Sequence, residues 1–320
     1  MPSEFDLIAR YFSRATPSAI LGPGDDCALV APAAGMELAL TTDMLVEGTH
    51  FLAGTDPEQL GWKTLAVNLS DLAAMGATPR WILLAGALPE ADEDWIGRFA
   101  EGFFACAKRY RAEVIGGDTT RGPRNLCVTA MGELPAGTAL RRDGAGNNDD
   151  IWVSGQPGLA ALGLAHLQGR TALPETLARR CIAALQKPLP RVELGLRLRG
   201  LATAAIDVSD GLLADLGHIL ERSGLVADLI EGQLPCIPHG CDPTLARECQ
   251  LSGGDDYELC FTVPAARRQS VVMLAAELDL PLWRIGHVLA DTGRTVGDIR
   301  LLDAGEQLTP LTHRGFDHFG

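Results

Sequence analysis

The residues of this 320-residue chain best suited to chemistry are aspartates that recur in short motifs beside glycine, serine or threonine. Carboxylate and hydroxyl oxygens are ligands that Mg²⁺ and Ca²⁺ prefer and zinc does not. Glycines beside the carboxylates let backbone N–H groups approach a phosphate closely. The motifs stand where an apolar stretch stops or a helix is expected to begin, and they are Gly24-Asp25-Asp26, Thr41-Thr42-Asp43, Gly116-Gly117-Asp118-Thr119-Thr120, Asp207-Val208-Ser209-Asp210-Gly211 and Gly253-Gly254-Asp255-Asp256.

Each motif also has a simpler interpretation. A single G-D-D or S-D-G is more often a turn or a helix N-cap than a set of metal ligands. Asp71 shares one face of its predicted helix with Asn68 and Thr64, but by itself it would be a solvated helix position. Composition and spacing leave both interpretations open, and the repetition of the motifs amid apolar flanks favours a site with several cations.

The overall charge bears on the same question. With 27 Lys and Arg against 41 Asp and Glu, the net charge is −14, which argues against nucleic acid or an anionic membrane as partner. The same surface repels phosphate esters, so phosphate-bearing substrates require divalent cations at the site. The Walker A motif, the kinase H-R-D and D-F-G motifs, H-E-x-x-H and G-x-S-x-G are all absent from the sequence.

The eight cysteines are scattered without a C-x-x-C pair, which favours reduced thiols over zinc ligands or disulfides. No apolar run approaches the ~18 residues that a membrane span requires. The N-terminal residues lack the basic-then-apolar order of a secretory signal, so we expect a cytoplasmic protein.

The elements that must position these residues alternate between strands and helices. Before the polar stretch Pro135–Asp150, we expect helices at 4–12, 56–75 and 92–111, and strands at 27–30, 37–40, 81–84, 114–115 and 126–131. After it, we expect strands at 151–153, 203–206, 226–230, 258–263 and 284–289, with helices at 158–168, 174–186, 190–199, from 211 to about 223, and at 265–279. The pattern predicts two α/β domains with a boundary in the polar stretch.

The motifs also follow one another in the order of a known family. The matching segments are EFDLIARYF (4–12), GDDCA (24–28), TTDMLVEGTHF (41–51), VNLSDLAAMGA (67–77), GGDTTRGP (116–123), DVSDGLLADLG (207–217), SGGDDYELCF (252–261) and GFDHF (315–319). From end to end the chain resembles the thiamine-monophosphate kinases, in the superfamily that includes aminoimidazole ribonucleotide synthetase and selenophosphate synthetase.

The resemblance implies a two-domain α/β (α+β) fold of the aminoimidazole ribonucleotide synthetase type. Residues 1–136 would form an N-terminal domain that binds ATP and metal and whose sheet pairs with that of a second subunit in a homodimer. Residues 137–320 would form a C-terminal α/β domain that completes the active site. The implied activity is ATP-dependent phosphorylation of thiamine monophosphate to thiamine diphosphate, by direct in-line transfer assisted by several Mg²⁺ ions.

The family's site residues carry over to positions of this sequence. The implied metal ligands are Asp26, Thr41, Thr42, Asp43, Asp71, Asp118, Asp207 and Asp210, with Asp43, Asp71, Asp118 and Asp207 central to metal-assisted catalysis. The implied ATP-binding residues are Tyr110, Gly117, Asp118, Arg142 and Ser209, and the implied substrate-binding residues are His50, Asp255 and Phe316. From the residues alone, His50 would be an ordinary strand-end histidine and Phe316 a tail residue docking on the core.

The sequence departs from the family at two places. Asp255 stands where members usually have Glu, and Leu159-Ala160 stand where Asp-Ser is common after Val153-Ser154-Gly155. Two other functions remain as alternatives: another ATP-using synthetase of the superfamily, or a relative that binds nucleotide and metal without catalysis.

Overall fold

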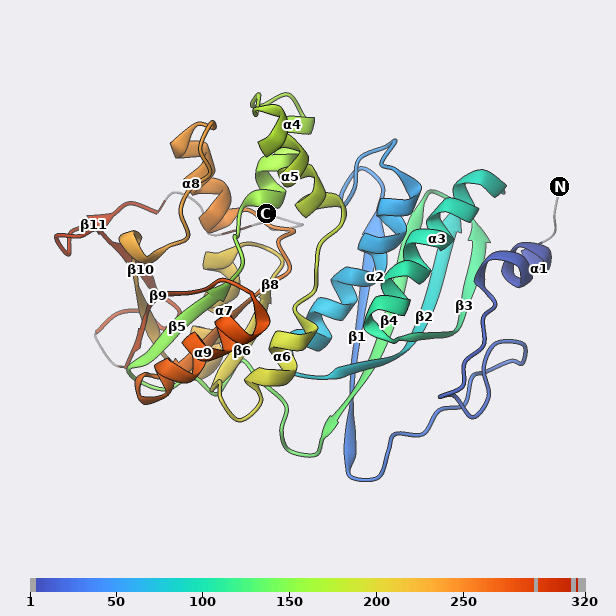
Figure 1. Cartoon of the computed structure of the whole chain (residues 1–320), viewed down its shortest axis with the longest axis horizontal. Helices are drawn as coiled ribbons and strands as arrows, with labels where there is room; N and C mark the ends of the chain where they lie inside the picture. The colour runs from blue at the N-terminus through green and yellow to red at the C-terminus, as the bar shows by residue number, and fades with distance from the viewer. Residues whose placement is uncertain (1–3, 291–292, 312–314, 316–320) are drawn as a thin grey trace. The chain divides into compact units, whose positions relative to one another are not determined.

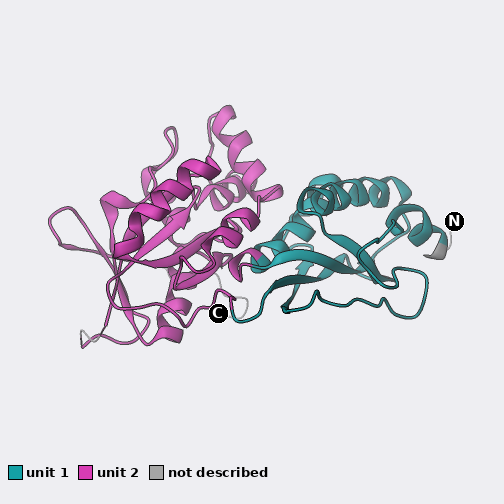
Figure 2. Cartoon of the chain, turned by 60° about the horizontal axis from the view of Figure 1, so that its bottom comes forward, with its two compact units in different colours: residues 1–72, 77–137 teal, residues 73–76, 138–320 magenta. Residues whose placement is uncertain are grey.

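The computed structural model describes residues 4–290, 293–311 and 315. The chain forms two compact units (Figure 2), unit 1 from residues up to Leu72 and from Ala77–Gly137, and unit 2 from Ala73–Gly76 and the residues from Thr138 onward. Within the described ranges, no helix combines the length and apolar character that crossing a bilayer demands.

Unit 1 is built on a four-stranded sheet with strand order β1-β4-β2-β3. The strands are β1 (Met36–Val46), β2 (Thr78–Leu88), β3 (Glu113–Arg121) and β4 (Asn125–Pro135). β4 is antiparallel to both of its neighbours, and β2 is parallel to β3. Two long helices, α2 (Pro57–Ala74) and α3 (Glu93–Tyr110), lie over one face of this sheet, and the chain begins with α1 (Glu4–Leu7) and a π-helical turn, Ile8–Phe12 (Figure 1).

Both long helices of unit 1 start at the caps that the sequence predicts. The Asp56 carboxylate accepts the N–H of Gln59 at 3.1 Å, one residue before Pro57 opens α2. Asp92 accepts the N–H groups of Asp94 and Trp95 at the start of α3. The predicted extents of the two helices are therefore confirmed to within one or two residues.

The strands of unit 1 differ from expectation in two ways. The strand expected at 27–30 is wrong, because Leu29 makes only an isolated bridge with Leu21, and Ala28 and Val30 pack in a loop against Trp81. The strands expected to stop near Asp43 and Asp118 instead run past both residues, to Val46 and Arg121. β1 and β3 are the outer strands of the sheet, where polar side chains retain access to water.

Unit 2 contains a mixed seven-stranded sheet with strand order β11-β10-β7-β9-β5-β8-β6. Its strands are β5 (Asp149–Ser154), β6 (Ala204–Val208), β7 (Val226–Ile230), β8 (Glu258–Pro264), β9 (Leu282–Leu289), β10 (Ile299–Leu302) and β11 (Leu308–Thr309). Its helices are α4 (Leu159–Leu167), α5 (Glu175–Gln186), α6 (Val192–Leu198), α7 (Leu212–Ser223), α8 (Pro243–Ser252) and α9 (Arg268–Leu278), with 3-10 turns at Glu231–Gln233 and Ala265–Arg267. The predicted mixed α/β class is confirmed, whereas α8, β10 and β11 were not expected.

The core of unit 2 lies between the sheet and α7. Ile206, Leu216, Ile219 and Cys260 belong to one cluster of buried apolar side chains there. Because β5 and β6 are both antiparallel to β8, which lies between them, they run in the same direction. Their carboxyl ends therefore lie at the same end of the sheet, on either side of the start of β8.

Candidate active-site motifs

In unit 1, a strand and a helix hold Thr41, Asp43 and Asp71 together. The Thr41 hydroxyl donates a hydrogen bond to the Asp71 carboxylate, and the N–H of Asp43 donates to Oδ1 of Asn68 at 3.0 Å. Asn68 is fully buried, and its amide donates to the carbonyl of Thr64 within α2. The face of α2 that carries Thr64, Asn68 and Asp71 therefore lies against β1. The alternative interpretation of Asp71 as a solvated helix position is wrong, because its carboxylate is hydrogen-bonded to β1.

Asp118 stands in a different part of the same sheet. One row of paired residues runs from Asp43 through Val128 and Leu84 to Gly117, and the next row runs from Met44 through Cys127 and Ala85 to Asp118. Successive rows point to opposite faces of a sheet, and three strand spacings span about 14 Å. Asp118 thus projects from the face and the edge opposite to those of Asp43.

Thr42 lies on the same face as Asp118 but at the edge with β1. Its hydroxyl donates to the carbonyl of Val128 at 2.9 Å and lies 3.0 Å from the hydroxyl of Thr129. Unit 1 therefore brings Thr41, Asp43 and Asp71 together, and it leaves Thr42 and Asp118 on the other face of the sheet.

Three more predicted residues of unit 1 have defined surroundings. Nδ1 of His50 accepts the N–H of Val46 at 3.0 Å and so closes the turn after β1. Tyr110 ends α3, with its ring 6.4 Å from that of Trp62 in an edge-on arrangement. Asp26 lies exposed in the loop before β1, where its N–H donates to Oδ1 of Asp25.

In unit 2, the predicted residues cluster around the loop between β6 and α7. Asp207 is the next-to-last residue of β6 and is only 4% exposed. Ser209, Asp210 and Gly211 form the loop, and their three N–H groups all donate to Oδ2 of Asp215, at 3.0, 3.1 and 3.2 Å. Asp215 was not among the predicted site residues, although an acid in the first turn of a helix after a glycine loop is a recognisable signal.

A second loop, residues 253–257, is hydrogen-bonded to the first, residues 209–211. The N–H of Asp255 donates to the carbonyl of Ser209, and the N–H of Tyr257 donates to that of Val208, both at 2.8 Å. The Tyr257 hydroxyl in turn donates to Oδ1 of Asp255 at 3.0 Å. Gly254 permits this approach, since a Cβ there would lie 2.4 Å from the Ser209 carbonyl oxygen. The structure therefore brings Ser209, Asp210 and Asp255 together in two bonded loops, 209–211 and 253–257, which we call the loop pair.

The described end of the chain reaches the same loop. A Cβ built on Gly315 would lie 2.9 Å from the carbonyl oxygen of Asp210. Phe316, the next residue and a predicted substrate contact, lies outside the described residues. Arg142 is elsewhere in unit 2, where its carbonyl accepts a hydrogen bond from the Ser223 hydroxyl at 3.0 Å.

Two carboxyls next to these loops have raised pKa values. Burial, reinforced by the nearby Asp210 charge, raises the pKa of Asp215 to about 6, against the opposing effect of its backbone hydrogen bonds. Burial also raises the pKa of Asp256 well above its usual value. Asp256 accepts the N–H of Gly158 at 2.7 Å and so caps α4, which has no side-chain cap of its own.

The oxygen donors of the two units suit a hard divalent cation. Hydroxyl and carboxylate oxygens of Thr41, Asp43 and Asp71, and those of Asp207 and Asp210, match the ligands of Mg²⁺. Among the described residues, however, no three His, Cys, Asp or Glu side chains gather closely enough to hold a metal ion. The complete metal-ligand set therefore stays a prediction.

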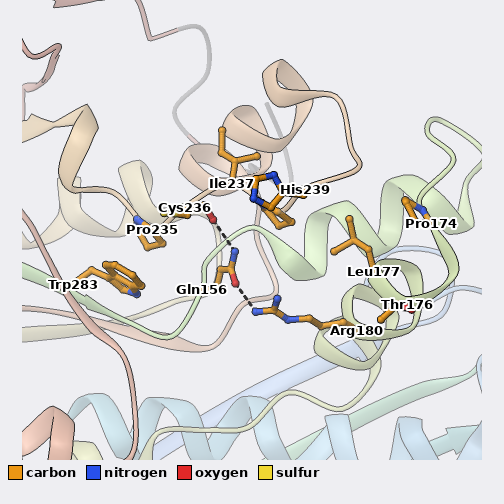
Figure 3. Close-up of a pocket in the computed structure, with 11 residues that line it drawn as sticks. Gln156, Pro174, Thr176, Leu177, Arg180, Pro235, Cys236, Ile237, His239 and Trp283 are labelled. Atoms are coloured by element: carbon orange, nitrogen blue, oxygen red, sulfur yellow. Dashed lines mark hydrogen bonds between the residues drawn. The ribbon is translucent and has the colours of Figure 1, made fainter.

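A separate cavity of about 490 Å³ opens in unit 2, and it involves none of the predicted site residues. Gln156 lies at its centre (Figure 3), donating to the carbonyl of Cys236 at 2.9 Å and accepting from Arg180. Trp283, Leu177 and Ile237 supply apolar walls.

Comparisons with family models and with known proteins indicate the same family. Residues 24–134 match the family model "AIR synthase related protein, N-terminal domain", and residues 147–299 match "AIR synthase related protein, C-terminal domain". The thiamine-monophosphate kinase of Salmonella typhimurium is 45% identical over 99% of this chain and 98% of its own length.

Solved structures agree with the sequence comparison. The crystal structure of thiamine-monophosphate kinase from Stenotrophomonas maltophilia is 49% identical, with a TM-score of 0.83 over 94% of this chain and 95% of that one. A structure of AaThiL complexed with AMPPCP and TMP is 31% identical, with a TM-score of 0.76 over 90% of this chain and 89% of that one.

Proposed function

Because this chain belongs to the thiamine-monophosphate kinases, within the AIR synthase related family, we propose that it transfers the γ-phosphoryl group of ATP to thiamine monophosphate. The products are ADP and thiamine diphosphate. The observation that carries the proposal is the loop pair of unit 2, which holds Ser209, Asp210 and Asp255 together next to Gly315. These are motifs assigned to metal, ATP and substrate, and they come from three distant segments of the chain.

The roles of the residues follow the donor chemistry. Asp26, Thr41, Thr42, Asp43, Asp71, Asp118, Asp207 and Asp210 would hold several Mg²⁺ ions. When bound, Mg²⁺ would neutralise charge on the phosphates and orient them for reaction. Gly117, Asp118, Arg142, Ser209 and Tyr110 would hold ATP, and His50, Asp255 and Phe316 would contact thiamine monophosphate.

The transfer is proposed to be direct and in line. Hydrogen bonds orient two of the predicted carboxylates, because Asp71 accepts from the Thr41 hydroxyl and Asp255 accepts from the Tyr257 hydroxyl. Carboxylates oriented in this way suit catalysis by positioning and charge neutralisation, with the acceptor phosphate itself as the nucleophile. An aromatic side chain at Phe316 would suit the cationic thiazolium ring.

A homodimer is part of the proposal, with unit 1 as the pairing domain. The face of the sheet that carries Asp118 also carries Leu40 and Met44, which are 63% and 51% exposed. Both outer strands, β1 and β3, have one side without a strand partner in the described chain. A second copy that covers this face would bury apolar area. A cytoplasmic location remains a prediction from the sequence.

The decisive experiment uses purified protein with ATP, Mg²⁺ and thiamine monophosphate. Separation of the products by chromatography should show thiamine diphosphate and ADP formed in equal amounts. Parallel reactions with a purine-pathway precursor and with selenide test the other synthetases of the superfamily. Tight nucleotide binding without turnover of any substrate would instead identify a non-catalytic relative.

A further inference from the structure

The junction between β6 and α7 is unusual in where its backbone donors point. A strand–glycine loop–helix junction ordinarily directs consecutive N–H groups outward, and these bind the phosphate of a nucleotide. Here the N–H groups of Ser209, Asp210 and Gly211 converge on one carboxylate oxygen of Asp215. Asp215 belongs to the first turn of α7 and is 3% exposed.

We propose that Asp215 is a positioning residue that occupies, from inside the protein, the place a phosphate takes at such a junction. With these three N–H groups bonded to Asp215, the loop turns the side chains of Ser209 and Asp210 toward a ligand in place of its backbone donors. The outer side of the loop is thereby reserved for a divalent cation, and phosphate reaches it through that cation. This inference deepens the proposed function and rests on it for the kinetic part of the test.

The surroundings of the loop support a fixed orientation. The Ser209 and Val208 carbonyls are already bonded to the N–H groups of Asp255 and Tyr257. Gly211 has a φ of 124°, which a residue with a side chain rarely adopts, and a Cβ there would lie 2.8 Å from the backbone of Ser252. Hydrogen bonds from Asp255 and Tyr257 therefore hold the carbonyl groups of this segment, and Asp215 holds the N–H groups of residues 209–211. The side chains of Ser209 and Asp210 are then the groups that can change conformation.

The test compares Asp215→Ala and Asp215→Asn with the wild type. Asp215→Ala leaves three N–H groups without their acceptor, so amide hydrogen exchange of a peptide spanning 209–211 should accelerate about 10-fold or more. The Mg²⁺ concentration for half-maximal activity should rise about 10-fold, and inorganic phosphate should inhibit the variant more strongly than the wild type. Asp215→Asn keeps a neutral acceptor of the same size, so its changes should be smaller, about 3-fold.

A matched control is Asp228→Asn, which removes a second buried carboxylate of unit 2. Asp228 accepts from Arg294 and Arg300 and makes no described bond to the loop. It should lower thermal stability while leaving the Mg²⁺ requirement and phosphate inhibition at wild-type values. Should Asp215→Ala not fold, Asp215→Asn carries the same comparison.

The possible outcomes distinguish the positioning role of Asp215 from the proposed kinase activity. Wild-type exchange rates and an unchanged Mg²⁺ requirement in both Asp215 variants would overturn the positioning role, as would effects no different from those of Asp228→Asn. A wild-type protein without turnover of thiamine monophosphate would defeat the proposed function alone. Hydrogen exchange and Mg²⁺-induced thermal shifts would then still decide the role of Asp215.

Discussion

The hydroxyl of Thr41 donates a hydrogen bond to the carboxylate of Asp71, although the two residues are 30 positions apart, one on β1 and the other on α2. The bond crosses from the sheet to the helix that covers it. It fixes the orientation of the Asp71 carboxylate, which the sequence by itself would place at a solvated helix position.

Thr41→Val should weaken both stability and metal binding. The variant keeps the shape of the side chain but removes the donor, which should cost about 1 kcal/mol of unfolding free energy. Asp71 then loses the hydrogen bond from Thr41 that orients its carboxylate, so the apparent affinity for Mg²⁺ should fall. Urea unfolding and a Mg²⁺ titration of activity measure the two effects. Thr55→Val is the control, because the Thr55 hydroxyl donates to the Leu52 carbonyl in the loop before α2. An equal loss of Mg²⁺ affinity in that variant would contradict the assignment.

Asp118→Asn should abolish most turnover and leave the fold intact. The substitution keeps the volume of an exposed residue on an outer strand but removes its charge, so a metal ligand would be weakened without loss of packing. We expect a fall in kcat of about 100-fold or more, with an unchanged melting temperature. Asp279→Asn, at the exposed end of α9, gives the comparison for charge removal alone. Near-normal activity of Asp118→Asn would mean that Asp118 binds no metal.

Asp228 should make unit 2 sensitive to acid. Burial alone would raise the pKa of Asp228, but hydrogen bonds from Arg300 and Arg294 outweigh it and hold the pKa below the ordinary 3.8. A carboxyl whose pKa is lowered by folding contributes stability above its unfolded pKa and loses it as the pH falls through the folded value. The difference in unfolding free energy between wild type and Asp228→Asn should therefore be full above about pH 5 and shrink below about pH 4. Urea unfolding from pH 3 to pH 7 measures it, and a difference that grows toward acid would have the wrong sign.

Leu40→Glu should convert a dimer into monomers. A charge at Leu40, beside the exposed Met44 on outer strand β1, would oppose burial of this face by a second copy. Light scattering after size-exclusion chromatography gives the mass of the wild type and the variant. Met273→Glu, at a residue of α9 that is 53% exposed in unit 2, is the matched control and should retain the wild-type mass. A wild type that is monomeric at micromolar concentration would refute the pairing itself.

Local signals in the sequence were sufficient for most elements. Asp56-Pro57 and Asp92 mark helix starts because a cap acts over three residues, and both are seen in the structure. The same signal, Asp242-Pro243, begins α8, a helix that is absent from the sequence prediction. Cys27–Val30 has the composition of a strand, but a strand needs a neighbour of adequate length, and no local pattern tells whether one is available.

The site was less accessible to sequence reasoning, because its geometry depends on register. The motifs identified Asp43 and Asp118 as equivalent acids, yet pairing across four strands places them on opposite faces. Asp215 is not among the predicted site residues, for a related reason. Its function lies in accepting the N–H groups of residues 209–211, and backbone donors leave no trace in the identity of the residues that carry them.

Asp255 and Asp256 are adjacent in the chain but serve different elements. Asp255 is bonded to Tyr257, whereas Asp256 reaches a residue 98 positions earlier and completes the start of α4. Since α4 begins with Leu159-Ala160 and has no cap of its own, its first turn depends on the 253–257 loop. Any displacement of that loop during a reaction cycle must either carry the first turn of α4 along or leave it uncapped. Lengthening the side chain in Asp256→Glu would thus disturb the first turn of α4, whereas Asp255→Glu would introduce the residue that is usual in the family and leave that turn capped.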